Sequence, residues 1–189
     1  MDQRGVLFKS DEEPIEQPPQ LDPSQRTRRQ NIIEELIRTE KDYIGHLEML
    51  QLLKKQLEET GRLTGDSVYS IFLNLNNILD FGRRFLIRIE QHDQLPESEQ
   101  NWGRLFTHYQ TAFAVYEPFI ANNSRCTATV EREWDKIRMV GDHSRDLQQM
   151  VASVATLSGF LLKPFQRMTR YPMMLAVSPH VPIECCIGC

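Results

Sequence analysis

The sequence predicts an all-α protein built as an elongated bundle of long helices. Apolar residues recur at spacings of three and four over most of residues 23–175, which is typical of amphipathic helices. The sustained alternation of apolar and polar residues that indicates half-buried strands is missing from the sequence. The chain has 189 residues, 40% hydrophobic and 25% charged, and a formal net charge of −4. This composition is typical of one globular domain and gives no reason to expect a nucleic acid as partner.

The longest predicted helix covers residues 23–60. Asp22 and Pro23 are typical of an N-cap followed by the first helical position, and Gly61 is a stop signal. At about 1.5 Å rise per residue, this helix is about 57 Å long. Its apolar stripe consists of Ile33, Leu36, Tyr43, Leu47, Leu50 and Leu57.

Four further helices are predicted. They cover residues 66–89, 102–120, 126–141 and 144–175. The third of the five helices should be interrupted near Pro118. Pro164 lies inside the last helical pattern and predicts a kink or a local repair, because its ring clashes with the preceding turn and it donates no hydrogen bond.

The two ends of the chain differ from the helical region. Residues 1–22 combine prolines with acids and glutamines, so we expect a disordered N-terminal tail. Residues 176–189 contain two prolines and three cysteines without a helical stripe, so we expect an irregular C-terminal tail. No apolar run reaches the roughly 18 residues of a membrane span, and the N-terminus lacks a signal-peptide core. These observations predict a soluble, cytoplasmic protein with no transmembrane segment.

Signatures of covalent catalysis are missing from the sequence. It contains no glycine-rich phosphate loop and no Gly-x-Ser-x-Gly elbow, and its five histidines are scattered without metal-ligand spacing. We therefore expect no catalytic residues, no metal and no cofactor, and a protein that is not an enzyme.

Two charged runs carry the functional signal. The first spans residues 35–43 on the long helix, and the second spans residues 160–175, where Lys163, Arg167 and Arg170 share one helical face. Such a cationic stripe can present charge to a partner. The alternatives are solvated faces of amphipathic helices, or Arg167 and Arg170 binding acids within the bundle, with Asp146 and Glu90 as candidate partners.

The two runs resemble the first and third conserved blocks of Dbl-homology domains, which promote nucleotide exchange on Rho-family small GTPases. The matching residues are Glu35, Leu36, Thr39, Glu40 and Tyr43 in the first block, and Lys163-Pro164, Gln166-Arg167 and Tyr171-Pro172 in the third. Residues 116–120 are similar to the weaker second block. The likeness covers roughly residues 28–175, and the fungal cell-polarity exchange factors are the most similar subfamily.

The resemblance implies a function and a set of contact residues. The chain would bind a Rho-family GTPase and promote GDP release by stabilising the nucleotide-free state. Glu35 would contact the first switch segment and Lys163 the second, with Thr39 and Gln166 supporting the interface. Membrane contact would be at most peripheral, through recruitment to the cell cortex. The alternatives are a non-catalytic helical scaffold or decoy that binds a GTPase or polarity protein, and a bundle unrelated to GTPases.

The chain departs from the family pattern after the third block. The family normally continues its long helix and adds a further helical stretch there, whereas residues 176–189 follow no such pattern. We therefore expect a domain truncated at its C-terminus, with weakened or lost exchange activity. The predicted truncation would leave apolar surface exposed around residues 168–175, and such patches favour association.

Overall fold

The computed structural model describes residues 23–143 and 145–176, and within these ranges the protein contains helices and no strands. The α-helices are α1 Pro23–Thr60, α2 Gly65–Phe72, α3 Leu75–Asp93, α4 Trp102–His108, α5 Glu117–Ala121, α6 Asn123–Ile137, α7 Arg145–Met150, α8 Val154–Leu161 and α9 Lys163–Ala176. Short 3₁₀ helices lie at Glu97–Glu99, Gln110–Tyr116 and Arg138–His143. The predicted all-α class is confirmed. The predicted tails, 1–22 and all of 176–189 except Ala176, lie outside the described residues.

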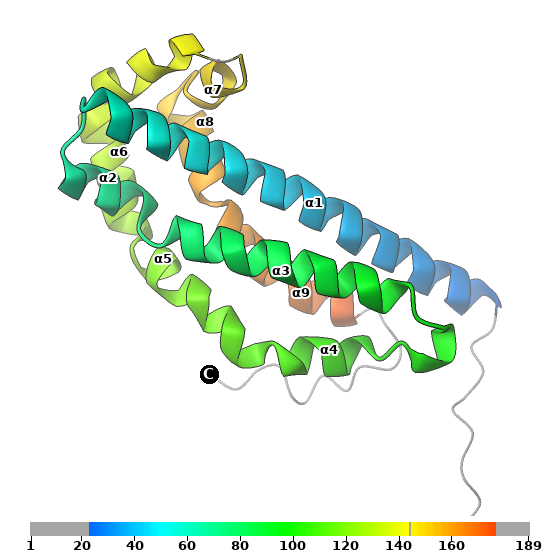
Figure 1. Cartoon of the computed structure of the whole chain (residues 1–189). Coiled ribbons are helices and arrows are strands. Elements are labelled where there is room, and N and C mark those ends of the chain that lie inside the picture. Colours follow the sequence, from blue (N-terminus) through cyan, green and yellow to red (C-terminus); the bar gives the residue numbers. More distant parts are fainter. Residues whose placement is uncertain (1–22, 144, 177–189) are drawn as a thin grey trace, which may run out of the picture.

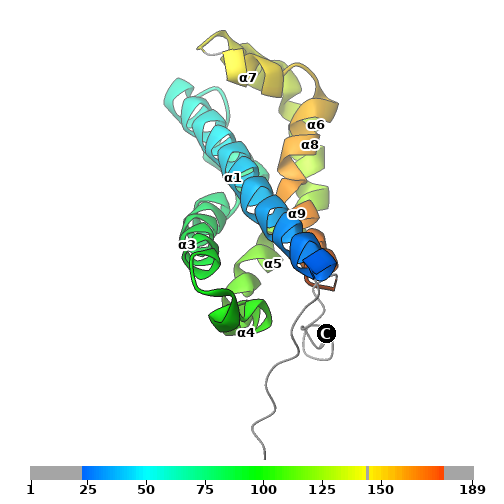
Figure 2. The same ribbon diagram turned by 90° about the vertical axis from the view of Figure 1, so that its right-hand side faces the viewer.

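The bundle is elongated along α1, which runs its full length (Figure 1). Helix α3 lies antiparallel to α1 on one side, and α8 and α9 lie on the other side (Figure 2). Helix α4 lies near the start of α1, and α7 lies near its end. The apolar stripe of α1 therefore forms the centre of the core, where Leu47, Leu50, Leu53 and Leu57 are fully buried.

The predicted bounds of the longest helix are confirmed. Helix α1 begins at Pro23 and ends at Thr60, and it contains 38 residues. Gly61 follows with a φ of 60°, and its N–H donates to the carbonyl of Glu58 at 3.2 Å. Because L-residues avoid positive φ, a glycine at this position ends the helix without strain.

The prediction of a single helix over residues 66–89 is wrong, because this region forms two helices, α2 and α3. The break lies at Leu73, whose φ is 40°, and the side-chain amide of Asn74 donates to the carbonyl of Val115 at 2.7 Å. Leu75 and Ile78 continue the apolar spacing of Ile71 and Phe72, so the pattern carries no sign of this turn. The turn coincides with a tertiary contact that the local sequence does not indicate.

The last predicted helix is also divided. Ser153 has an extended backbone, with φ −153° and ψ 160°, and its Oγ accepts from the N–H of Thr156 at 3.0 Å, which starts α8. Helix α8 ends at Leu161, and Pro164 takes the second position of α9, where a missing N–H leaves no bond unmade. The expected local repair at Pro164 is thus a break between two helices. The region 102–120 is similarly split into α4, a 3₁₀ helix and α5.

Among the described residues, no helix combines the length and the low polarity needed to cross a lipid bilayer.

Two glycines of α1 and its C-terminal turn allow a matched stability test. Gly61→Ala should lower the free energy of unfolding by about 1 kcal/mol, because alanine would be strained at positive φ. Gly45→Ala, in the middle of α1, should raise it by about 0.5–1 kcal/mol. An added Cβ meets nothing within 4 Å at either position, so steric contact does not enter the comparison. Urea unfolding measures both values, and equal shifts of the same sign would contradict the assigned backbone roles.

Candidate functional site

Helix α9 brings the second charged run against the first. Arg167 contacts the turn of α1 that contains Leu36 and Glu40, and Arg170 contacts Glu35. The residue further along α9 thus contacts the residue nearer the start of α1. This order of contacts shows that the two helices are antiparallel. Helices α1 and α9, which are far apart in the sequence, thus lie side by side (Figures 1 and 2).

A buried ionic cluster lies at the centre of this contact. Glu40 is fully buried and Arg167 is 4% exposed, and Arg167 Nε donates to Glu40 Oε2 at 2.6 Å. The hydroxyl of Tyr171 donates to the same carboxylate oxygen at 2.8 Å. Burial raises the pKa of the Glu40 carboxyl, while the charge of Arg167 and the hydrogen bond from Tyr171 oppose this shift. The cluster thus compensates a charge that the core could not otherwise hold.

Aromatic rings enclose one side of the ionic cluster. The ring of Tyr171 packs at centroid distances of 5.9 Å from Phe85, 5.5 Å from Phe106 and 5.4 Å from Phe113. The guanidinium carbon of Arg167 lies 4.7 Å from the centre of the Tyr171 ring. Burial raises the pKa of Tyr171 well above its ordinary value, so its hydroxyl remains a neutral donor. These rings cover one side of the cluster and join α9 to α3 and α4.

The surface next to the buried cluster carries a second ion pair. Arg170 Nη2 donates to Glu35 Oε1, and the two side chains are 47% and 46% exposed. Exposed ion pairs contribute about 0–1 kcal/mol to stability, because water screens them. Glu35 and Arg170 are therefore accessible to a partner at little cost to the fold.

A polar depression of about 310 Å³ lies between α1 and α9 beside this pair. Its lining residues are Arg38, Thr39, Asp42, Tyr43, His46, Lys163, Gln166, Arg167 and Arg170. Burial and the positive charge of Lys163 lower the pKa of His46, and the ring of Phe160 packs against it at 5.4 Å. The lining combines hydroxyl, amide and imidazole groups with charges of both signs.

The predicted contact residues lie on this one face. Thr39, Lys163 and Gln166 line the depression. Glu35 lies next to it, because Glu35 pairs with Arg170, which is also a lining residue. The partner of Glu35 is therefore Arg170, two helical turns along α9 from Lys163. The Thr39 hydroxyl donates to the carbonyl of Glu35 at 2.7 Å, so it supports the turn that carries Glu35.

The prediction of three cations presented to a partner is wrong for Arg167, which points into the bundle. The alternative, that it binds an acid within the bundle, is confirmed, but the acid is Glu40. Glu90, a candidate partner in the sequence, instead pairs with Lys41 at 2.7 Å. The sequence analysis named Glu40 in the first block and Arg170 in the cationic stripe, but it predicted neither the Glu40–Arg167 pair nor the Glu35–Arg170 pair.

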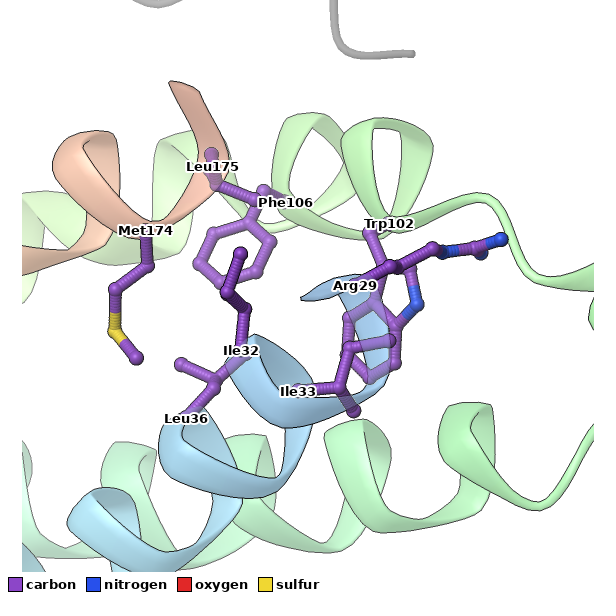
Figure 3. A pocket seen from close by; sticks show the side chains of 8 residues that line it. All are labelled: Arg29, Ile32, Ile33, Leu36, Trp102, Phe106, Met174 and Leu175. Atoms are coloured by element: carbon purple, nitrogen blue, oxygen red, sulfur yellow. The ribbon is translucent and has the colours of Figure 1, made fainter. Parts of the chain in front are cut away.

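A second hollow, at the end of the bundle, is apolar and small. It has a volume of about 20 Å³, room for about one water molecule. In Figure 3 the side chains of Ile32, Phe106 and Met174 converge on it from α1, α4 and α9. Met174 and Leu175 pack here, so the predicted exposed surface around residues 168–175 is limited to residues such as Met173, which is 69% exposed. The size and apolar lining of the hollow indicate a packing gap.

Chemical groups for catalysis are not concentrated at this face. Among the residues whose positions are described, no three His, Cys, Asp or Glu side chains are grouped to hold a metal ion. The face instead offers paired charges and hydrogen-bonding groups on two helices that are locked together. Fold and site together define an all-helical module with a polar, charged face between α1 and α9.

The family of this module follows from comparison with known proteins. The sequence model of the RhoGEF domain matches residues 32–177, which include both charged runs. The chain belongs to the RhoGEF domain family, and the predicted resemblance to Dbl-homology domains is confirmed.

Two fungal proteins are among its relatives. Cell division control protein 24 of Saccharomyces cerevisiae is 32% identical over 157 residues, which is 81% of this chain and 18% of that protein. Rho guanine nucleotide exchange factor scd1 of Schizosaccharomyces pombe is 34% identical over 141 residues, 75% of this chain and 15% of that protein. The chain therefore spans less than a fifth of the length of these relatives.

A solved structure supports the fold. The apo structure of the activated truncation of Vav1 superimposes with a TM-score of 0.70 and 21% sequence identity. The superposition covers 82% of this chain and 39% of that chain. This chain and that structure therefore share the arrangement of their helices.

The buried cluster predicts unequal effects for two arginines that both pair with acids of α1. Arg167→Met should lower the free energy of unfolding by about 3–5 kcal/mol, because it leaves the buried Glu40 charge unpaired. Arg83→Met should cost less than about 1 kcal/mol, because the Arg83–Glu48 pair is about half exposed. Chemical denaturation of both variants measures the difference. Similar losses would show that burial does not control the energy of these pairs.

The environment of His46 predicts a loss of stability in acid. The lowered pKa in the folded protein means that the unfolded chain binds a proton at His46 more readily, so stability falls as the pH drops below the unfolded value of about 6.5. His46→Gln should therefore reduce the decrease in melting temperature between about pH 7.5 and about pH 5.5. His108→Gln, at an exposed position, is the control. An unchanged pH dependence in His46→Gln would refute this assignment.

Proposed function

We propose that this chain is a guanine-nucleotide exchange module that binds a Rho-family small GTPase and promotes GDP release by stabilising the nucleotide-free state. The observation that carries the proposal is the accessible Glu35–Arg170 pair beside a polar depression, on a chain of the RhoGEF family. The names of relatives such as the exchange factor scd1 agree with it.

Exchange of this kind requires differential binding and no covalent step. A small GTPase holds its nucleotide with mobile segments, so a protein that binds better to the open arrangement shifts the population toward it. Moving the equilibrium from 1:99 to 99:1 takes about 5.5 kcal/mol of differential affinity. Several contacts must act together to supply this energy. We assign Glu35 to the first switch segment and Lys163 to the second, with Thr39 and Gln166 supporting the interface.

The Glu35–Arg170 pair prepares this face for binding. In the free protein each side chain holds the other in place, which reduces the conformational entropy that binding must remove. The pair is about half exposed, so redirecting either charge toward a partner costs little. Charges at the rim of such a face also accelerate association, and this effect weakens at high ionic strength.

A second candidate function is a non-catalytic scaffold or decoy that binds a GTPase or a polarity protein. The polar depression would serve such binding equally well, because it contains no group specific to exchange. Two measurements on a panel of Rho-family GTPases separate the candidates. Release of a fluorescent GDP analogue indicates exchange, whereas capture of nucleotide-free GTPase without release indicates a decoy. For either function we place the protein in the cytoplasm, with peripheral recruitment to the cell cortex.

Glu35→Ala should abolish exchange and leave the fold intact. Removing one member of a charge pair that becomes desolvated on binding typically costs about 2–5 kcal/mol, or roughly 30-fold to several-thousand-fold in affinity. Glu35 is half exposed, so the helical content by circular dichroism should not change. GDP release from a responsive GTPase measures the effect.

Glu48→Ala is the matched control for this test, because Glu48 is an exposed acid of the same helix that pairs with Arg83 of α3. Its exchange rate should stay within about twofold of the unmodified protein. Full activity in Glu35→Ala, or equal losses in both variants, would remove Glu35 from the proposed interface.

A further inference from the structure

Arg167 contacts one turn of α1 with all three of its side-chain nitrogen atoms. Nε donates to Glu40 Oε2 at 2.6 Å, and Nη1 donates to Thr39 Oγ1 at 2.9 Å. Nη2 donates to the carbonyl oxygen of Leu36 at 3.2 Å. A guanidinium is planar and its donors have fixed directions, so these bonds set both the height and the rotation of α9 against α1.

Two short paths lead from Arg167 to the exposed Glu35. Along α1, the Thr39 oxygen that accepts from Arg167 carries the hydrogen that Thr39 donates to the carbonyl of Glu35 at 2.7 Å. Along α9, Arg170 lies one turn after Arg167 and pairs with the Glu35 carboxylate. Both the backbone and the carboxylate of Glu35 are thus tied to Arg167, which is itself only 4% exposed.

We propose that Arg167 is a positioning residue for the contact face: its bonds to α1 fix the register at which Glu35 and Arg170 lie opposite each other. Its effect on the Glu35–Arg170 pair stands on the geometry alone. Its effect on nucleotide exchange rests on the proposed function.

The competing explanation is that the Glu40–Arg167 pair only stabilises the bundle. Buried ion pairs are poor sources of net stability, because apolar residues of similar volume often replace them without loss. Apolar replacements would, however, provide no directional donors. A double replacement therefore separates the two roles, since the fold should survive while the register is no longer fixed.

The test compares two double variants. Glu40→Met with Arg167→Met removes the buried pair, and Glu48→Met with Arg83→Met removes an exposed pair between α1 and α3 as the matched control. The readout is the Nε–Hε NMR signal of Arg170, assigned by its loss in Arg170→Lys. In the unmodified protein and in the control, adding Glu35→Gln should shift this signal. In the buried-pair variant the shift should disappear, while circular dichroism still reports a cooperatively unfolding helical protein.

Exchange provides the second readout. Release of a fluorescent GDP analogue from a responsive Rho-family GTPase should fall at least about tenfold in the buried-pair variant and less than about twofold in the control. Adding Glu35→Ala to the buried-pair variant should cost little more, because the pair is already misplaced. A retained Arg170 shift together with retained exchange would overturn the positioning role and leave the proposed function intact.

Two further outcomes are also decisive. If the unmodified protein releases GDP from no GTPase of the panel, the proposed function fails, and the Arg170 signal alone still decides the positioning role. If the double variant does not fold, Arg167→Lys replaces it, because lysine keeps the buried charge but lacks the planar donors. Loss of the Arg170 response in that variant supports the proposal, and a retained response contradicts it.

Discussion

One buried interaction joins the two charged runs of the sequence, the bond between Glu40 and Arg167. A carboxylate inside an apolar stripe is costly unless a cation and further donors reach it, and α9 supplies both Arg167 and Tyr171. The same contact joins α9 to α1 and surrounds the ion pair with the rings of α3 and α4. The outer face with the Glu35–Arg170 pair lies directly beside this contact.

Much of the fold could be predicted from apolar spacing, because that spacing reports which side of a helix is buried. It succeeded for α1, whose start and end also carry local signals in Pro23 and Gly61. It failed at Leu73 and Ser153, where the chain turns while the apolar spacing continues. The turn at Leu73 coincides with the hydrogen bond from Asn74 to the distant carbonyl of Val115, a contact that no local pattern encodes.

The contact roles that the resemblance gave to Glu35, Thr39, Lys163 and Gln166 stay predictions. The pairing of charges between α1 and α9 was not predicted, because spacing alone could not say which acid meets which cation. One signal was present in the sequence. Glu40 lies between Leu36 and Tyr43 at the spacing of the buried stripe, so an acid occupies a core position. A buried acid is costly without a partner of opposite charge. In the structure this partner is the buried Arg167.

The sequence distance across this contact has a consequence for folding. Glu40 and Arg167 are 127 residues apart, and Glu35 and Arg170 are 135 residues apart. During synthesis, Glu40 leaves the ribosome long before Arg167 is added to the chain. Until then, α1 carries an unpaired carboxylate in its apolar stripe. Contacts of such long range close late and slowly. The contact between α1 and α9 can therefore form only after α9 has been synthesised.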